Sequence, residues 1–164
     1  MVVEKNVRIT ERFFDNRYKT WLINGKDMNR KVKVLLAKLG LDVHNRGLVT
    51  VAMELRDEGM EVIYLGNCMP DEIITTAIQE QVDVIGVSSL GGAHLSLGSL
   101  LMQKAEQKGF KDELVFLIGG VFSPEDAEEL ARIGFDGVYP PGSSRGTIVS
   151  GLKEALAEKQ SLSC

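Results

Sequence analysis

The chain has 164 residues, of which 44% are hydrophobic and 26% are charged. This length fits a single domain, and this composition is typical of a globular protein and excludes a disordered or collagen-like chain. With 19 basic and 23 acidic residues, the formal net charge is −4. The sequence therefore offers no basic surface for nucleic acid.

No segment of the sequence predicts membrane insertion or export. The longest run of apolar residues and glycine, residues 114–122, is far shorter than the roughly 20 residues of a spanning helix. The first residues contain no apolar signal core, so we expect a cytoplasmic protein without a membrane partner. Cys68 and Cys164 are too few for a disulfide scaffold, and we expect both to be reduced thiols.

Residues 1–30 show no sustained helical or alternating period, and we interpret them as an N-terminal extension. This segment contains Phe13, Phe14, Tyr18 and Trp21, which would form an exposed apolar cluster. Such clusters mark contact surfaces, but terminal segments are also often poorly ordered. A docking arm and a poorly ordered tail both stay open.

From residue 31 onward, predicted strands and helices alternate. Short β-branched runs predict strands at residues 32–37, 61–65, 82–88, 114–118 and 137–139. Helical spacing predicts helices at residues 48–58, 71–80, 95–108, 124–133 and 147–158. Pro70 and Pro124 stand at helix starts, and Ser123 is a candidate helix cap. Because parallel strands need crossover connections, we expect an α/β fold, a flavodoxin-like doubly wound sheet of five parallel strands in the order 2-1-3-4-5 with helices on both faces.

The expected loops at the carboxyl ends of these strands are rich in glycine and small hydroxyl residues. They span residues 38–47, 66–69, 88–94, 119–123 and 140–144. Ligands of doubly wound sheets bind beyond these strand ends, and a missing Cβ lets a large ligand approach the backbone. Helix starts prefer glycine and serine in any case, but two Gly-Gly steps on one rim favour a ligand site.

Common nucleotide and phosphate motifs are absent from this rim. It lacks the dinucleotide fingerprint and the P-loop pattern, and Ser88-Ser89-Leu90 stands where a receiver domain has its phosphorylatable aspartate. The first loop instead places Asp42 two residues before His44, so a carboxylate can orient the imidazole. A single histidine is too few for a zinc site held by protein side chains. Any metal here must bring most of its own ligands.

Three short motifs on the rim together resemble a known family. Asp42-x-His44-x-x-Gly47, Ser88-x-Leu90 and Gly119-Gly120 resemble the D-x-H-x-x-G, S-x-L and G-G signature of cobalamin-binding domains. Residues 37–42, 84–90 and 141–143 are most similar to the acyl-CoA mutase branch, as in the cobalamin domain of methylmalonyl-CoA mutase. The resemblance implies a cobalamin-binding domain over residues 31–164.

The resemblance also implies a role for each motif residue. His44 would be the lower axial ligand of the cobalt, replacing the dimethylbenzimidazole of the cofactor in the base-off state. Asp42 would bind the far imidazole nitrogen, with Lys38 behind it. The displaced nucleotide tail would enter a slot between the strands. The other implied cofactor-binding residues are Asn45, Arg46, Gly47, Ser88, Leu90, Gly119, Gly120, Gly142 and Ser143; no catalytic side chain is expected.

Three further features have simpler interpretations. His94 follows a glycine turn at a helix start, which favours a cap or an exposed side chain. Asp126, Glu128 and Glu129 are interpreted as a solvated helix face. Cys68 is interpreted as a packing residue of the rim.

The function that the resemblance implies is that of a subunit of an adenosylcobalamin-dependent acyl-CoA mutase, which is an isomerase. The substrate barrel of such enzymes takes roughly 250 residues. We therefore expect a large acyl-CoA-binding partner subunit and no turnover by this chain alone. A corrinoid carrier for methyl transfer, a cobalamin-dependent sensor or chaperone, and the small subunit of glutamate mutase stay as alternatives. Methylmalonyl, isobutyryl and 2-hydroxyisobutyryl thioesters are all compatible substrates.

Overall fold

The structure, a computed structural model, describes residues 30–41, 44, 46–90 and 92–162. Its contacts divide the chain into Met1–Lys31 and a compact unit, Val32–Cys164. Of the predicted N-terminal extension, residues 1–30, only Arg30 is among the described residues. The docking arm therefore stays a prediction.

Five parallel strands form one sheet in the order β2-β1-β3-β4-β5. The order and the parallel pairing confirm the predicted fold class. β1 and β3, in the middle, are buried on both faces, which explains why they read as nearly continuous apolar runs. The strands are β1 (Lys33–Leu39), β2 (Glu61–Cys68), β3 (Val84–Ser89), β4 (Val115–Gly120) and β5 (Gly137–Tyr139).

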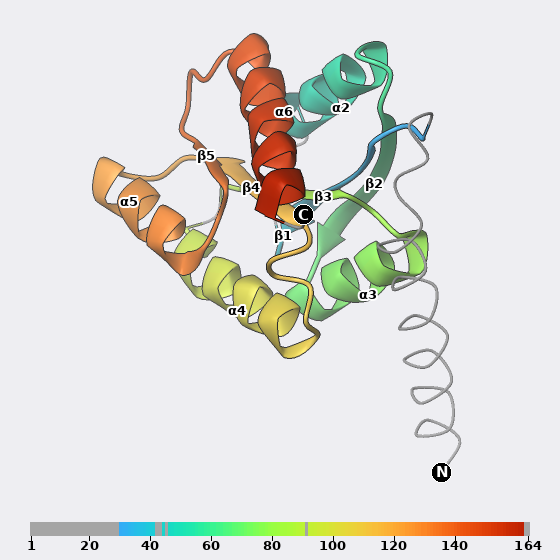
Figure 1. Ribbon diagram of the computed structural model, residues 1–164. Coiled ribbons are helices and arrows are strands. Elements are labelled where there is room, and N and C mark those ends of the chain that lie inside the picture. The colour runs from blue at the N-terminus through green and yellow to red at the C-terminus, as the bar shows by residue number, and fades with distance from the viewer. Residues whose placement is uncertain (1–29, 42–43, 45, 91, 163–164) are drawn as a thin grey trace. The chain divides into compact units, whose positions relative to one another are not determined.

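Helices cover both faces of the sheet. In Figure 1, α2 and α6 lie on one face, and α3, α4 and α5 lie on the other. Among the described residues, no helix has the length and apolar content needed to cross a membrane. The helices are α2 (Arg46–Asp57), α3 (Pro70–Glu80), α4 (His94–Gln107), α5 (Pro124–Ile133) and α6 (Arg145–Leu162).

The sheet separates two apolar clusters. Leu35 of β1 belongs to the cluster under α3, α4 and α5, which also contains Phe116 and Leu130. The neighbouring residue Val34 belongs to the cluster under α2 and α6, which also contains Leu152. Because successive side chains of a strand point to opposite faces, each central strand contributes to both cores.

The helix starts follow the sequence signals. Pro70 and Pro124 are both at the first turn of their helices, where the missing backbone N–H has no helical partner to lose. The backbone N–H of Asp126 donates to Ser123 Oγ at 3.1 Å. Ser123 is therefore the predicted cap of α5.

Four strands run further toward the rim than the sequence predicted, and of these β3 extends by one residue, to Ser89. The predicted loop at residues 66–69 was wrong, because β2 continues through Cys68 after a bulge that pairs Ala37 with Gly66. Gly66 has φ +75, which glycine adopts without strain. The Gly40 N–H then donates to the Cys68 carbonyl at 2.9 Å. The same extension places residues 38–39 in β1 and residues 119–120 in β4, rather than in the predicted loops.

The central position of β1 generates a stability prediction. Leu35 is fully buried, whereas Leu41 is 94% exposed. We expect Leu35→Ala to lower the free energy of unfolding by about 2–5 kcal/mol, and Leu41→Ala to change it by less than about 0.5 kcal/mol. Urea unfolding followed by circular dichroism measures both. Equal losses would contradict the central placement of β1.

Candidate functional site

A cavity of about 540 Å³ opens at the carboxyl ends of the strands, and residues of α2 and α6 contribute to its lining. This volume lies in the range of small-molecule sites. The predicted binding residues that line it are His44, Arg46, Gly47, Ser88, Leu90, Gly119, Gly120, Gly142 and Ser143. The structure therefore brings together residues that stand about 100 positions apart in the sequence.

Three predicted site residues are not among the cavity-lining residues. Lys38 is 5% exposed and lies within β1. Asp42 and Asn45 lie outside the described residues, so the predicted contact of Asp42 with His44 stays a prediction.

The cavity exists because side chains are small where the sheet faces α2 and α6. In the strand register, Gly86 lies between Leu36 and Leu117, and further along β3, Ser88 lies beside Gly119. A Cβ on Gly86 would come within 2.7 Å of Leu36 Cδ2. Larger residues at these positions would fill the space between the sheet and the two helices.

An apolar wall surrounds the inner part of the cavity. Leu55 and Leu152 are buried and come from the two covering helices, α2 and α6. These residues could not be predicted as cavity-lining from the sequence, because their helical spacing indicates a core face and not a gap beside it. The other unpredicted lining residues are Val34, Leu36, Leu48, Thr50, Val51, Gly86, Val87, Leu117, Ile118, Val121, Tyr139, Pro140, Pro141, Arg145 and Ile148.

Polar and charged side chains line the mouth of the cavity. His44, Arg46 and Arg145 are exposed lining residues. Arg145 Nη1 lies 3.5 Å from Glu54 Oε2, which ties α6 to α2. Ser143 Oγ donates to the Pro140 carbonyl at 2.7 Å and holds the β5–α6 loop in a turn. Two guanidinium groups beside an imidazole suit a ligand with an anionic group.

Tyr139 is the last residue of β5 and lines the cavity. A Cβ on Gly151 would overlap its hydroxyl oxygen, and a Cβ on Gly137 would lie 2.8 Å from that oxygen. Burial, and secondarily the charge of Glu154, raise the pKa of Tyr139 above its ordinary value of 10.0. Tyr139 therefore lines the cavity as a neutral phenol.

The glycines of the site are required for different reasons. A Cβ on Gly120 would overlap the Ser89 carbonyl oxygen, so the close approach of β3 and β4 itself requires glycine there. A Cβ on Gly47 would meet no protein atom within 4 Å. The protein itself therefore does not need glycine at position 47.

The described residues contain no group of three or more His, Cys, Asp or Glu side chains that could hold a metal ion. His44 is therefore suited only to a metal that arrives with its other ligands in place. Cys68 is partly buried, and burial, followed by the charge of Glu72, raises the pKa of its thiol. The packing role predicted for Cys68 agrees with its contact with the core.

The interpretation of His94 as a cap or an exposed side chain was wrong. Ala93 is the cap residue of α4, and the His94 side chain is buried with 6% relative exposure. His94 Nε2 lies 2.8 Å from Asp126 Oδ2, so Asp126 does not belong to a purely solvated face. The reason is tertiary: α5 brings its first turn beside the first residue of α4.

Residues 32–148 match the family model described as B12 binding domain. This chain belongs to the B12-binding domain family. The match spans every strand of the sheet and the cavity-lining loops, and it identifies cobalamin as the cofactor. An open cavity of this size, with glycines at its mouth and an apolar interior, fits the long tail of that cofactor.

Two relatives are small subunits of acyl-CoA mutases. The chain is 40% identical over 129 residues to the 2-hydroxyisobutanoyl-CoA mutase small subunit of Aquincola tertiaricarbonis, a match that covers 78% of this chain and 94% of the relative. It is 38% identical over 132 residues to the pivalyl-CoA mutase small subunit of Xanthobacter autotrophicus, covering 79% and 86%. These matches confirm the resemblance to the acyl-CoA mutase branch.

Longer relatives match over a small part of their length. The methylmalonyl-CoA mutase large subunit of Streptomyces virginiae is 35% identical over 116 residues, which is 70% of this chain and 16% of that protein. The chain thus corresponds to one segment of that large subunit.

Solved structures support the fold. A cobalamin-binding protein from Desulfitobacterium hafniense superposes with a TM-score of 0.66 at 21% identity, covering 76% of this chain and 58% of that one. The chemotaxis response regulator CheY4 of Vibrio cholerae superposes with a TM-score of 0.61 at 20% identity, covering 77% and 99%. At these identities, the likeness shows the shared flavodoxin-like fold.

The exposed glycine at the mouth generates a binding prediction. In Gly47→Leu, the new side chain meets no protein atom at its Cβ, and leucine is the better helix former by up to about 1 kcal/mol. We expect unchanged or slightly higher stability and an affinity for cobalamin that is lower by about tenfold or more, since overpacking a site costs about 1–3 kcal/mol. Equilibrium titration followed by absorbance measures the affinity.

Gly146 provides a matched control. Like Gly47, it is the second residue of its helix, follows an arginine and is exposed, but it does not line the cavity. Gly146→Leu is expected to bind cobalamin with wild-type affinity. Equal losses in the two variants would contradict the proposed path of the ligand past Gly47.

Proposed function

We propose that this chain is the cobalamin-binding small subunit of a heteromeric, adenosylcobalamin-dependent acyl-CoA mutase, an isomerase. The observation that carries the proposal is the cavity of about 540 Å³ that has His44 at its mouth and most of the predicted cofactor residues in its lining. Similarity to two mutase small subunits over most of their length supports the subunit role.

In this proposal, His44 would be the ligand that this chain supplies to the cobalt. Its side chain is exposed and lines the cavity mouth, where it would bind a metal whose other ligands come with the cofactor. Asp42, two residues earlier, accepts a hydrogen bond from the far ring nitrogen and orients the imidazole. The buried ammonium group of Lys38 supports this carboxylate from within the sheet.

The cavity then holds the displaced nucleotide tail. Gly119 and Gly120 let the tail pass along the end of β4, and Ser88 and Leu90 form the neighbouring wall on the β3 side. The apolar residues of α2 and α6 exclude water from the dimethylbenzimidazole base of the tail. Its phosphate end is bound at the mouth by polar groups, which are Asn45, Arg46, Gly142, Ser143 and Arg145.

Adenosylcobalamin, when bound, supplies a carbon-centred radical through homolysis of its cobalt–carbon bond, and that radical starts the carbon-skeleton rearrangement. The residues of this chain orient the cofactor, hold its lower face and keep water from it. The acyl-CoA thioester binds to a large partner subunit. The two small-subunit relatives, which match nearly end to end, support this division of labour.

Replacement of His44 tests the ligand role directly. We expect wild-type protein to bind cobalamin with the absorption spectrum of the imidazole-ligated, base-off cofactor, and His44→Gly to lose that spectrum. Because His44 is exposed, the variant should keep the wild-type unfolding midpoint. Added imidazole should restore the spectrum of the glycine variant. Identical spectra for both proteins would remove His44 from the cobalt.

A second test concerns the partner subunit. Purified chain loaded with adenosylcobalamin should give no product from methylmalonyl-, isobutyryl- or 2-hydroxyisobutyryl-CoA, because the thioester site lies on another chain. Mass spectrometry of the thioesters measures turnover. Turnover by the chain alone would contradict the proposal, and transfer of a methyl group from bound methylcobalamin to a methyltransferase would favour a corrinoid carrier.

A further inference from the structure

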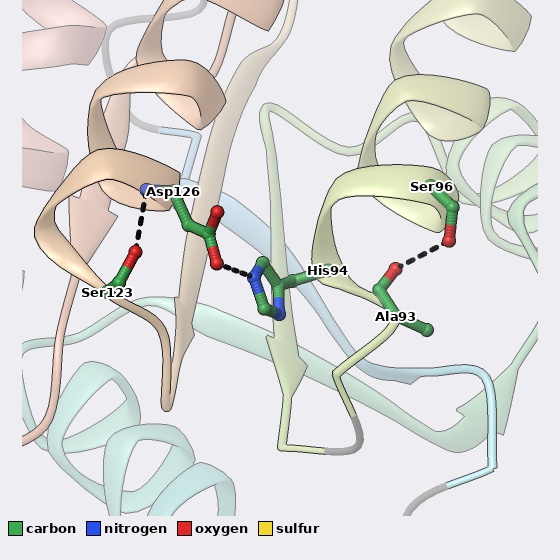
Figure 2. A network of polar contacts seen from close by, with 5 residues as sticks. All are labelled: Ala93, His94, Ser96, Ser123 and Asp126. Carbon is green, nitrogen blue, oxygen red and sulfur yellow. Dashed lines mark hydrogen bonds and ion pairs between the residues drawn. The ribbon is translucent and has the colours of Figure 1, made fainter.

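A partly buried polar pair lies on the face of the sheet opposite the cavity. His94 is the first residue of α4, and Asp126 is in the first turn of α5. Figure 2 shows the imidazole reaching across to the carboxylate, with His94 Nε2 2.8 Å from Asp126 Oδ2. The His94 side chain is 8% exposed, and the Asp126 side chain is 33% exposed.

The environment of each partner restricts its motion. The Phe122 ring packs against the imidazole with a centroid distance of 5.5 Å. The Asp126 backbone N–H donates to Ser123 Oγ at 3.1 Å, and the position of Asp126 at a helix start favours a carboxylate there. A buried histidine held between an aromatic ring and a carboxylate has a fixed orientation.

The second ring nitrogen defines the tautomer. His94 Nδ1 is buried and has no hydrogen-bond partner among the residues that the structure describes. The Nε2 atom faces an acceptor-only carboxylate and must carry a proton. In the neutral ring, Nε2–H is therefore the donor to Asp126, and Nδ1 carries the lone pair.

The pair joins the two connections that form one side of the cavity. The β3–α4 connection carries Leu90, and the β4–α5 connection carries Val121; both residues line the cavity. At the base of these connections, Ser89 pairs with Gly120, and the two strands approach so closely that only glycine fits. Beyond that point, the His94–Asp126 contact joins the first residue of α4 to the first turn of α5.

We propose that His94 and Asp126 are positioning residues of the cofactor site. Their hydrogen bond holds the β3–α4 and β4–α5 connections at the separation that places Leu90 and Val121 against the cofactor. Neither side chain lines the cavity, so the pair acts through these connections. This inference rests on the proposed cobalamin-binding function, since it assigns the support of that same site.

The test compares variants that delete or keep the hydrogen bond. His94→Leu removes the donor, whereas His94→Gln places an amide N–H near the position of Nε2. We expect His94→Leu to bind cobalamin about tenfold more weakly, which corresponds to the loss of one hydrogen bond of about 1.4 kcal/mol, and His94→Gln to recover most of that affinity. The spectrum of the bound cofactor at saturation should stay that of wild-type protein, because His44 is untouched.

Two variants of α5 complete the design. Asp126→Asn keeps an oxygen acceptor but loses the charge, and should weaken binding less than His94→Leu does. Glu129→Gln is the matched control, because Glu129 also forms an ion pair, 2.7 Å from Arg132, but within α5 itself. It should leave the affinity for cobalamin unchanged. If His94→Leu fails to fold, Asp126→Leu, which removes the acceptor, takes its place in the comparison with Glu129→Gln.

Measurements on the cofactor-free protein separate this inference from the proposed function. Long-range ¹⁵N–¹H spectra of the imidazole should report a proton on Nε2 of His94. Wild-type affinity in both His94→Leu and Asp126→Asn, or a proton on Nδ1 alone, would overturn the positioning role and leave the proposed function intact. Failure of the wild-type protein to bind cobalamin would overturn the proposed function itself.

Discussion

The site depends on glycines, which have no side chain, in the middle of the sheet. Gly86 and Gly119 lie in neighbouring strands on the face covered by α2 and α6, while Val34 and Leu152 belong to the apolar cluster between the sheet and those helices. An unfilled space of this kind lowers the stability of the free protein. A ligand that fills it restores those contacts and stabilises the folded state. The cavity therefore couples the stability of the folded protein to cofactor binding.

The two faces of the sheet serve different purposes. On the α3, α4 and α5 face, Phe116 and Leu130 are fully buried in a continuous core, and the His94–Asp126 pair fastens the rim above it. On the other face, the cavity opens between the sheet and the covering helices. A closely packed face can support loops whose positions a ligand requires. The close packing under α3, α4 and α5 thus supports the binding loops.

Short sequence motifs predicted part of the site. Gly47 and Gly119 could be found because a missing side chain is visible in the sequence itself. Leu152 could not be found in this way, because a residue in a filled core and a residue beside a cavity have the same helical spacing. His94 was misassigned since its partner, Asp126, stands 32 residues later, and no local pattern shows that two helix starts meet. The bulge at Gly66, which lengthens β2, depends on pairing with β1 and was also missed.

The sequence by itself determined the class of fold and the rim at which the predicted site residues gather. These follow from hydrophobic period and from the chemistry of turns, which depend on residues close together in the chain. Only the tertiary structure decided how deep the cavity is, which apolar side chains line it and that His94 is buried. Those outcomes depend on the summed volumes of side chains from separate strands and helices, and such volumes meet only when the chain has folded.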